Sequence, residues 1–200
     1  MAACKSRHTV QRMEPDIHTS DPAALQLFYT VRSCRWGQVL VAGDAQGLAF
    51  VLLGDDKASL VQDVMQRLPQ AQWATGNVQL HGWSDAVLRH LDRPQAPAQV
   101  PLRWRTGTAF QQQVWQALLQ IPLGQTRTYA QLAQAMGQQQ AVRAVANACA
   151  ANPLAVLVPC HRVLRSDGGW GGYRWGLTRK QGLLALEQAA VPSDAAATLI

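Results

Sequence analysis

Three segments in the second half of the chain begin with the same helix-start signal, and this repetition limits the possible folds more than any other feature. At Thr108, Thr128 and Thr178 a threonine precedes a glutamine by three residues, which is the capping-box pattern of a helix N-terminus. Apolar residues at helical spacing follow each signal, and Pro122 ends the first segment. We therefore predict a helical domain over residues 102–188.

A further helix is expected over residues 140–151, soon after the one that begins near Thr128. Gly137 separates the two as a C-cap glycine, and two short helices joined in this way form a helix-turn-helix candidate. Arg143 stands beside a stripe of alanines that would let the helix approach a nucleic-acid groove, although alanine also simply favours helix. The stripe consists of Ala141, Ala144 and Ala148, and the residues expected to face the core are Val142, Val145 and Cys149.

The first half of the chain predicts a small α/β domain over residues 31–101. Apolar segments within residues 31–54 flank a turn at 43–47, which is typical of a β-hairpin. Apolar residues at helical spacing then predict helices over 60–68 and 78–91. The segments outside the two domains, residues 1–30 and 189–200, are expected to be flexible tails.

The excess of positive charge lies entirely in the second half of the chain. The 200 residues include 18 Lys and Arg and 12 Asp and Glu, which gives a formal net charge of +6. Residues 1–100 hold nine of each sign, whereas residues 101–200 hold nine basic and three acidic residues. A basic half suits a polyanion partner because Lys and Arg displace counterions from phosphates, although a solubilising surface would look the same.

The four cysteines, at positions 4, 34, 149 and 160, show no paired spacing. This pattern suits a reducing cytoplasm better than a disulfide scaffold. The chain begins with polar and charged residues, and it holds no apolar run of 18 residues. We therefore expect a soluble cytoplasmic protein without a membrane partner.

A cysteine and a histidine are neighbours in the segment Val158-Pro159-Cys160-His161-Arg162. The cysteine stands at the exit of an apolar run, and the thiolate that it can form is the nucleophilic form of the side chain. A glycine-rich turn and a basic stretch follow over residues 167–176, which core packing does not explain. The segment therefore predicts a nucleophilic cysteine.

The motif Pro-Cys-His-Arg-Val at 159–163, the motif Gly-Tyr-Arg-Trp-Gly at 172–176 and the helix with Arg143 together resemble the O6-alkylguanine-DNA alkyltransferases. The resemblance covers roughly residues 31–188 and is greatest to the alkyltransferase half of the bacterial Ada proteins. It implies an α+β fold, with an N-terminal ribonuclease-H-like domain and a C-terminal winged-helix or helix-turn-helix domain. It also implies direct DNA repair, in which the alkyl group of O6-alkylguanine or O4-methylthymine moves irreversibly to the protein's own cysteine, once per molecule and without a cofactor.

The same resemblance assigns a role to each residue of the site. Cys160 would accept the alkyl group, His161 would take the thiol proton through a water, and Glu187 would orient the imidazole. Asn152 would tie the second helix of the helix-turn-helix to the active-site strand. Tyr129 would donate a hydrogen bond towards N3 of the extruded guanine.

Double-stranded DNA in a bacterial cytoplasm is the partner that the resemblance implies, bound through its minor groove by a monomer. The damaged nucleotide must leave the duplex, at a cost of about a few kcal/mol, and Arg143 would fill the gap. Ala141, Ala144 and Arg162 would contact the DNA. The expected pocket residues are Val158, Pro159, Tyr173, Arg174 and Trp175. For Trp175 the alternative is that the indole packs beneath the glycine-rich turn as part of the core.

Two departures from relatives limit what can be carried over. Ada proteins have a cysteine-coordinated zinc domain ahead of this region, and residues 1–30 contain only Cys4, so we do not expect transcriptional activation. Some relatives bind zinc in the N-terminal domain, but the spacing of Cys4, His8, His18 and Cys34 matches no compact site, and no metal is expected.

Two other interpretations remain open from the residues alone. A lesion sensor of the same fold would bind DNA without chemistry, but such proteins lack the acceptor that Cys160 would supply. A hydrolase could use Cys160, His161 and Glu187, although it would also need an oxyanion hole that no sequence feature identifies.

Overall fold

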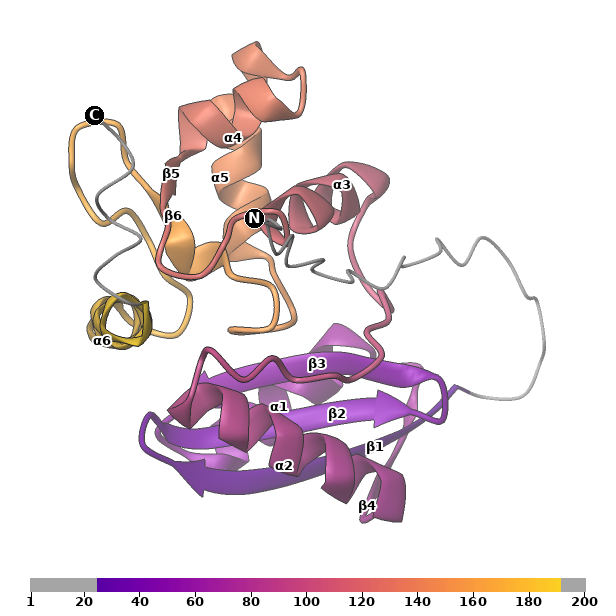
Figure 1. Cartoon of the computed structure of the whole chain (residues 1–200). Helices are drawn as coiled ribbons and strands as arrows, with labels where there is room; N and C mark the ends of the chain where they lie inside the picture. Colours follow the sequence, from indigo (N-terminus) through magenta and orange to yellow (C-terminus); the bar gives the residue numbers. More distant parts are fainter. Residues whose placement is uncertain (1–24, 192–200) are drawn as a thin grey trace, which may run out of the picture.

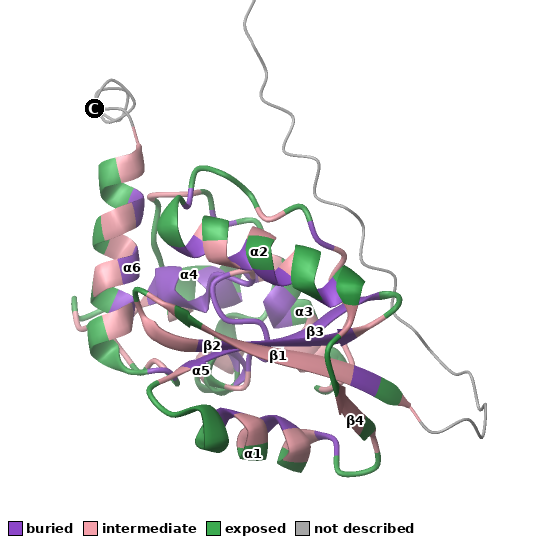
Figure 2. Ribbon diagram, turned by 90° about the horizontal axis from the view of Figure 1, so that it is seen from below, coloured by how far each residue is buried: buried purple, intermediate pink, exposed green. Residues whose placement is uncertain are grey.

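The computed structural model describes residues 25–191, which form a sheet domain followed by a group of helices (Figure 1). The sheet has the strand order β3-β2-β1-β4, in which β1, β2 and β3 are antiparallel and β4 runs parallel to β1. Helices α1 and α2 cover its opposite faces (Figure 2). These elements are β1 (Gln26–Cys34), β2 (Gly37–Asp44), β3 (Gly47–Gly54), α1 (Lys57–Arg67), β4 (Gln72–Thr75) and α2 (Val78–Asp92).

Strands β2 and β3 have continuous apolar sequences because both of their faces are covered. Residues 39–42 of β2 and 47–53 of β3 are all buried, as expected for strands between two layers of helices. The hairpin predicted at 43–47 is confirmed, and the pairing register shifts at Ala42 and Gly43. The short edge strand β4 was not predicted, because its four residues are partly or fully exposed and carry no apolar pattern.

Both expected domain boundaries shift outwards. The expected tail over 1–30 is wrong from residue 26 onwards, because β1 begins at Gln26 and Leu27 is fully buried against the core. The helix at the C-terminal end runs to Ala190, two residues beyond the expected boundary at 188. The rest of the two expected tails, residues 1–24 and 192–200, lies outside the described residues.

The second part of the chain is helical, as the start signals predicted. Both reciprocal capping boxes are present: Thr108 caps α3 with Gln111, and Thr128 caps α4 with Gln131. Gly137 follows α4 with a φ of 69°, the left-handed conformation of a C-cap glycine. The elements are α3 (Ala109–Leu118), β5 (Arg127–Thr128), α4 (Tyr129–Ala135), η1 (Gln139–Ala141), α5 (Val142–Ala150), η2 (Cys160–Arg162), β6 (Val163–Leu164) and α6 (Leu177–Ala190).

The third predicted cap is wrong. Helix α6 begins at Leu177, so Thr178 already lies in its first turn, and the N-cap position is Gly176. Gly176 has a φ of 98° and no side chain with which to cap the helix. Glycine adopts this backbone conformation without the steric cost that an L side chain would meet, and the helix therefore starts two residues early.

The two parts of the chain join along the edge strand β3. The backbone of Val51 donates to the carbonyl of Pro153 at 2.9 Å and accepts from Ala155 at 2.8 Å. Apart from this bridge at Leu154, residues 153–158 form bends and turns, and Cys160 begins the short helix η2, so the expected active-site strand is wrong. Val156 has a φ of 67°, a strained conformation for a β-branched residue, and the segment is thus held in place by its surroundings.

The expected α+β class is confirmed by this architecture. Three antiparallel strands, a helix and a fourth strand parallel to the first also agree with the expected ribonuclease-H-like domain. Helices α4 and α5, joined through Gly137 and η1, take the positions of the helix-turn-helix candidate. Within residues 25–191, no helix combines the length and apolar character needed to cross a membrane.

Candidate functional site

Cys160 lies at the start of the short helix η2, directly after the turn that follows α5, and only 5% of its surface is exposed. Its Sγ accepts a hydrogen bond from Nδ2 of Asn152 at 3.2 Å. Burial raises the pKa of the Cys160 thiol to about 11, although the Asn152 hydrogen bond and the charge of Lys180 act in the opposite direction. The resting side chain is therefore a thiol at neutral pH and must lose its proton during any reaction.

Asn152 connects the end of α5 to the cysteine segment. Its Oδ1 accepts from the backbone of Leu154 at 2.9 Å, and its Nδ2 donates to the carbonyl of Val158 at 2.8 Å as well as to the thiol of Cys160. The side chain is completely buried, so these hydrogen bonds satisfy polar atoms that water cannot reach. Asn152 thus sets the path of the chain from the end of α5 to the cysteine.

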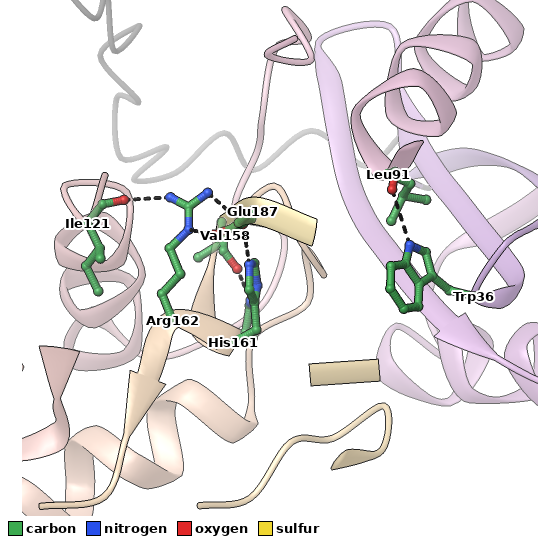
Figure 3. A network of polar contacts seen from close by, with 8 residues as sticks. Trp36, Leu91, Ile121, Val158, His161, Arg162 and Glu187 are labelled. Carbon is green, nitrogen blue, oxygen red and sulfur yellow. Dashed lines mark hydrogen bonds and ion pairs between the residues drawn. The ribbon is translucent and has the colours of Figure 1, made fainter. Parts of the chain in front are cut away.

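His161 and Arg162 both contact Glu187 of α6 in a buried network (Figure 3). Nε2 of His161 donates to Oε1 of Glu187 at 2.7 Å. The guanidinium of Arg162 donates to both carboxylate oxygens at 2.9 Å and to the carbonyl of Ile121 at 2.6 Å. Glu187 therefore accepts three hydrogen bonds from two side chains.

The charge states of this network follow from burial and hydrogen bonding. Burial raises the pKa of Glu187, but the hydrogen bonds from His161 and Arg162 outweigh it and hold the pKa at about 2. Burial lowers the pKa of His161 more than Glu187 raises it, so the imidazole is neutral. Because Nε2 carries the proton donated to Glu187, the other nitrogen, Nδ1, has a free lone pair, and it has no hydrogen-bond partner within the described residues. Nδ1 of His161 is thus available to accept a proton.

Arg162 was expected to contact DNA, and the structure contradicts this. Only 8% of its surface is exposed, and the hydrogen bonds to Glu187 and Ile121 occupy its guanidinium. A buried arginine needs such a partner because an unpaired charge in the core is strongly destabilising. Arg162 therefore balances the charge of Glu187.

A hollow of about 270 Å³ opens in front of Cys160. Parallel pairing of β5 with β6 brings the start of α4, and with it Tyr129, next to the cysteine segment. Burial raises the pKa of Tyr129 to about 12, so its hydroxyl keeps its proton and can donate a hydrogen bond. The walls of the hollow include Tyr129, Asn147, Cys149, Cys160, Tyr173 and Arg174.

Three of the expected pocket residues do not line this hollow. Val158 and Pro159 are buried, and the carbonyl of Val158 is used by Asn152. Trp175 is 6% exposed and packs edge-to-face against Tyr173, with ring centroids 5.1 Å apart. The alternative of core packing is therefore correct for Trp175, whose indole supports the ring of Tyr173 from the inside.

The exposed face of α5 differs from the expected alanine stripe. Arg143 and Ala144 are exposed and Ala141 is half-buried, but Ala148 is buried, and its carbonyl accepts from Trp115 at 2.8 Å. The exposed row continues instead through residues 147 and 150. Of the residues expected to face the core, Val145 and Cys149 are buried and Val142 is half-buried.

Asn147 and Lys180 are among the residues of the site that sequence reasoning missed. Asn147 lies both on the exposed face of α5 and in the wall of the hollow, and its spacing of four from Arg143 was the available signal. Lys180 is completely buried, and its Nζ donates to the carbonyls of Val163, at 2.6 Å, and Trp170. A lysine seven residues before Glu187, on the same helical face, could have indicated this role.

The structure describes one of the four zinc candidates. Cys4, His8 and His18 lie outside the described residues, and Cys34 stands in β1. Among residues 25–191, no group of three His, Cys, Asp or Glu side chains is arranged to hold a metal ion.

The segment that holds the site residues also matches a known protein family. Positions 109–189 match the family described as 6-O-methylguanine DNA methyltransferase, DNA binding domain. The bifunctional transcriptional activator/DNA repair enzyme Ada of Escherichia coli is 48% identical over 163 residues, which are 82% of this chain and 46% of that protein. The chain therefore spans about half the length of Ada. A methylated-DNA–protein-cysteine methyltransferase of Methanosarcina acetivorans is 36% identical over 163 residues, which are 80% of this chain and 98% of that protein.

The fold of this chain is also similar to solved structures of O6-methylguanine methyltransferases. The O6-methylguanine methyltransferase of Mycobacterium tuberculosis has a TM-score of 0.69 at 32% identity, with 85% of this chain and 98% of that chain covered. A structure of the Mycobacterium tuberculosis protein in complex with DNA has a TM-score of 0.67 at 32% identity, with 86% and 98% covered. The chain belongs to the methylated-DNA–protein-cysteine methyltransferase family.

Proposed function

We propose that this chain repairs DNA directly by taking the alkyl group of O6-alkylguanine, and of O4-methylthymine, onto Cys160. The observation that carries the proposal is a buried thiol at the hollow of about 270 Å³, followed in sequence by a neutral imidazole whose Nδ1 is free. A hydrolase would need an oxyanion hole as well, and a lesion sensor would need no acceptor thiol. Family membership supports the same chemistry.

The reaction we propose is an in-line displacement at the alkyl carbon. The thiol of Cys160 loses its proton to Nδ1 of His161 through a bridging water, and Sγ attacks the carbon attached to O6 of guanine. The carbon–oxygen bond breaks and its electron pair stays on the guanine, while Tyr129 donates a hydrogen bond towards N3 of the base. The protein then carries a thioether. Its carbon–sulfur bond is stable because the cysteine thiolate is a poor leaving group, so each molecule reacts once.

Glu187 makes this proton transfer feasible. Moving a proton from the thiol of Cys160, whose pKa burial raises to about 11, to the imidazole of His161, whose pKa burial lowers, is uphill. A preformed thiolate is therefore rare, and proton removal accompanies attack on the alkyl carbon. The carboxylate of Glu187, held ionised at a pKa of about 2, stabilises the imidazolium as it forms.

We propose double-stranded DNA in the bacterial cytoplasm as the partner, bound through the minor groove by one copy of the chain. The exposed face of α5 supports this, because small Ala144 permits close approach and Arg143 projects from the same face. Minor-groove contacts carry little sequence information, which suits lesions that occur in any sequence. Arg143 would enter the base stack where the damaged nucleotide leaves it.

Replacing the acceptor separates chemistry from DNA binding. We expect Cys160→Ala to abolish transfer from a duplex with a labelled O6-methyl group, while binding to the same duplex survives. Burial raises the pKa of Cys149 as well, so this second thiol in the hollow should not replace the acceptor. Transfer to Cys149 at an undiminished rate would contradict the proposal.

A further inference from the structure

An ion pair links the wall of the hollow to the sheet domain. Arg174 lines the hollow, and its guanidinium donates to both carboxylate oxygens of Asp63 at 2.9 Å. Asp63 lies on α1, 111 positions earlier in the chain. The same carboxylate also accepts from Arg67, one helical turn along, at 3.2 Å.

The segment that contains Arg174 is fixed at its ends by other contacts. At one end, Lys180 holds the carbonyl of Trp170. At the other end, Arg179 donates to the carbonyls of Trp175, at 2.9 Å, and Trp36, at 2.7 Å. Among the side-chain hydrogen bonds of the described residues, the pair with Asp63 is the one that reaches the middle of the segment.

The middle of the segment needs such an anchor because its backbone is intrinsically free. Glycines occupy positions 171, 172 and 176, and glycine has the widest conformational range of all residues. Gly171 also packs so closely against Tyr129 that a Cβ added there would lie 2.9 Å from the tyrosine hydroxyl. A shift of the segment would therefore change the shape of the hollow that Tyr129 and Tyr173 both line.

We propose that Asp63 is a positioning residue for the alkyl-transfer site, acting through Arg174 on the segment 171–176. The sheet domain then contributes to the reaction by holding the pocket wall, in addition to packing against the helical domain. This inference rests on the proposed function, because the site that Asp63 positions is the site of transfer. It also means that the charge of Arg174 is directed to α1 rather than to the substrate.

The first test measures single-turnover transfer from a methylated duplex at increasing protein concentration. We expect Asp63→Asn to lower the limiting rate constant about three- to fivefold, the size expected for a partly exposed ion pair, with the half-saturating concentration unchanged. Asp63→Glu should restore part of the rate. The matched control is Arg67→Gln, which removes the other ion pair of Asp63 on the same helix and should react at the normal rate.

A double-mutant cycle and a second readout complete the test. Asp63→Asn and Arg174→Gln should be non-additive, and Asp63→Asn should speed amide hydrogen exchange in residues 171–176, whereas Arg67→Gln should not. Normal transfer by Asp63→Asn, an equal loss in Arg67→Gln or additive losses would overturn the inference. If the unaltered chain transfers no methyl group, the proposed function fails, while the exchange measurement still decides whether Asp63 holds the segment.

Discussion

Glu187→Gln should destabilise the fold and slow alkyl transfer, because it removes the negative charge between His161 and Arg162. Holding the Glu187 carboxyl at a pKa of about 2, against a reference of 4.5, corresponds to roughly 3 kcal/mol of stabilisation at neutral pH. Breaking a buried ion pair by removing one partner costs about 3–5 kcal/mol, which gives the same range. We therefore expect the free energy of unfolding to fall by about 3 kcal/mol.

Urea denaturation at several pH values measures this loss and checks its sign. Because the pKa of Glu187 is lowered on folding, its contribution is present above about pH 4.5 and disappears as the pH falls towards 2. The Glu187→Gln variant lacks that titration. The difference in the free energy of unfolding between the unaltered protein and the variant should therefore narrow as the pH falls from about 4.5 towards 2. Transfer should slow by at least about 100-fold, since the imidazolium of His161 loses its counter-charge.

Two results would refute this reasoning about Glu187. A loss of stability below about 0.5 kcal/mol, the usual scatter of surface substitutions, would mean that the ion pair with Arg162 contributes little. A difference in the free energy of unfolding between the unaltered protein and Glu187→Gln that stays constant from pH 6 to pH 3 would mean that Glu187 is not the group that titrates.

Three further predictions concern docking and the core. Arg143→Ala should weaken repair of duplex lesions more than reaction with free O6-methylguanine, because a free base needs no flipping; equal losses would mean that Arg143 supports the fold. Trp175→Ala should lower the free energy of unfolding by about 3–5 kcal/mol in denaturation, because the indole is buried core; a stable variant that only gains reactivity with O6-benzylguanine would place Trp175 in the pocket. The affinity for undamaged duplex should fall steeply with salt in a binding titration and vary little with sequence; strong preference for one sequence would indicate a transcription factor.

Local sequence signals predicted the parts of this fold that local interactions determine. The capping boxes at Thr108 and Thr128 satisfy backbone donors within one helical turn, so a four-residue pattern is sufficient to find them. The hairpin at 43–47 and the C-cap at Gly137 are local in the same sense. The prediction of Thr178 as an N-cap was wrong because Gly176, with a left-handed backbone conformation, already occupies the N-cap position. No sequence pattern reports that backbone angle.

The misassigned site residues depend on contacts between distant segments. The resemblance placed Arg162 on DNA, but its guanidinium is bound in the core by Glu187 and Ile121, 25 and 41 positions away. Trp175 was placed in the pocket by its position in a motif, whereas packing against Tyr173 turns it inwards. A motif identifies which residues share a region, and only the tertiary structure decides which of them face the substrate.

Peptide mass spectrometry after reaction with excess O6-methylguanine duplex decides whether Cys160 is the acceptor and whether each molecule reacts once. We expect one added methyl group per molecule, located on the peptide that contains Cys160, with no further gain at longer times. The repaired duplex should then contain guanine in an amount equal to the protein. More guanine than protein, or a methyl group on another residue, would show that Cys160 is not a single-use acceptor.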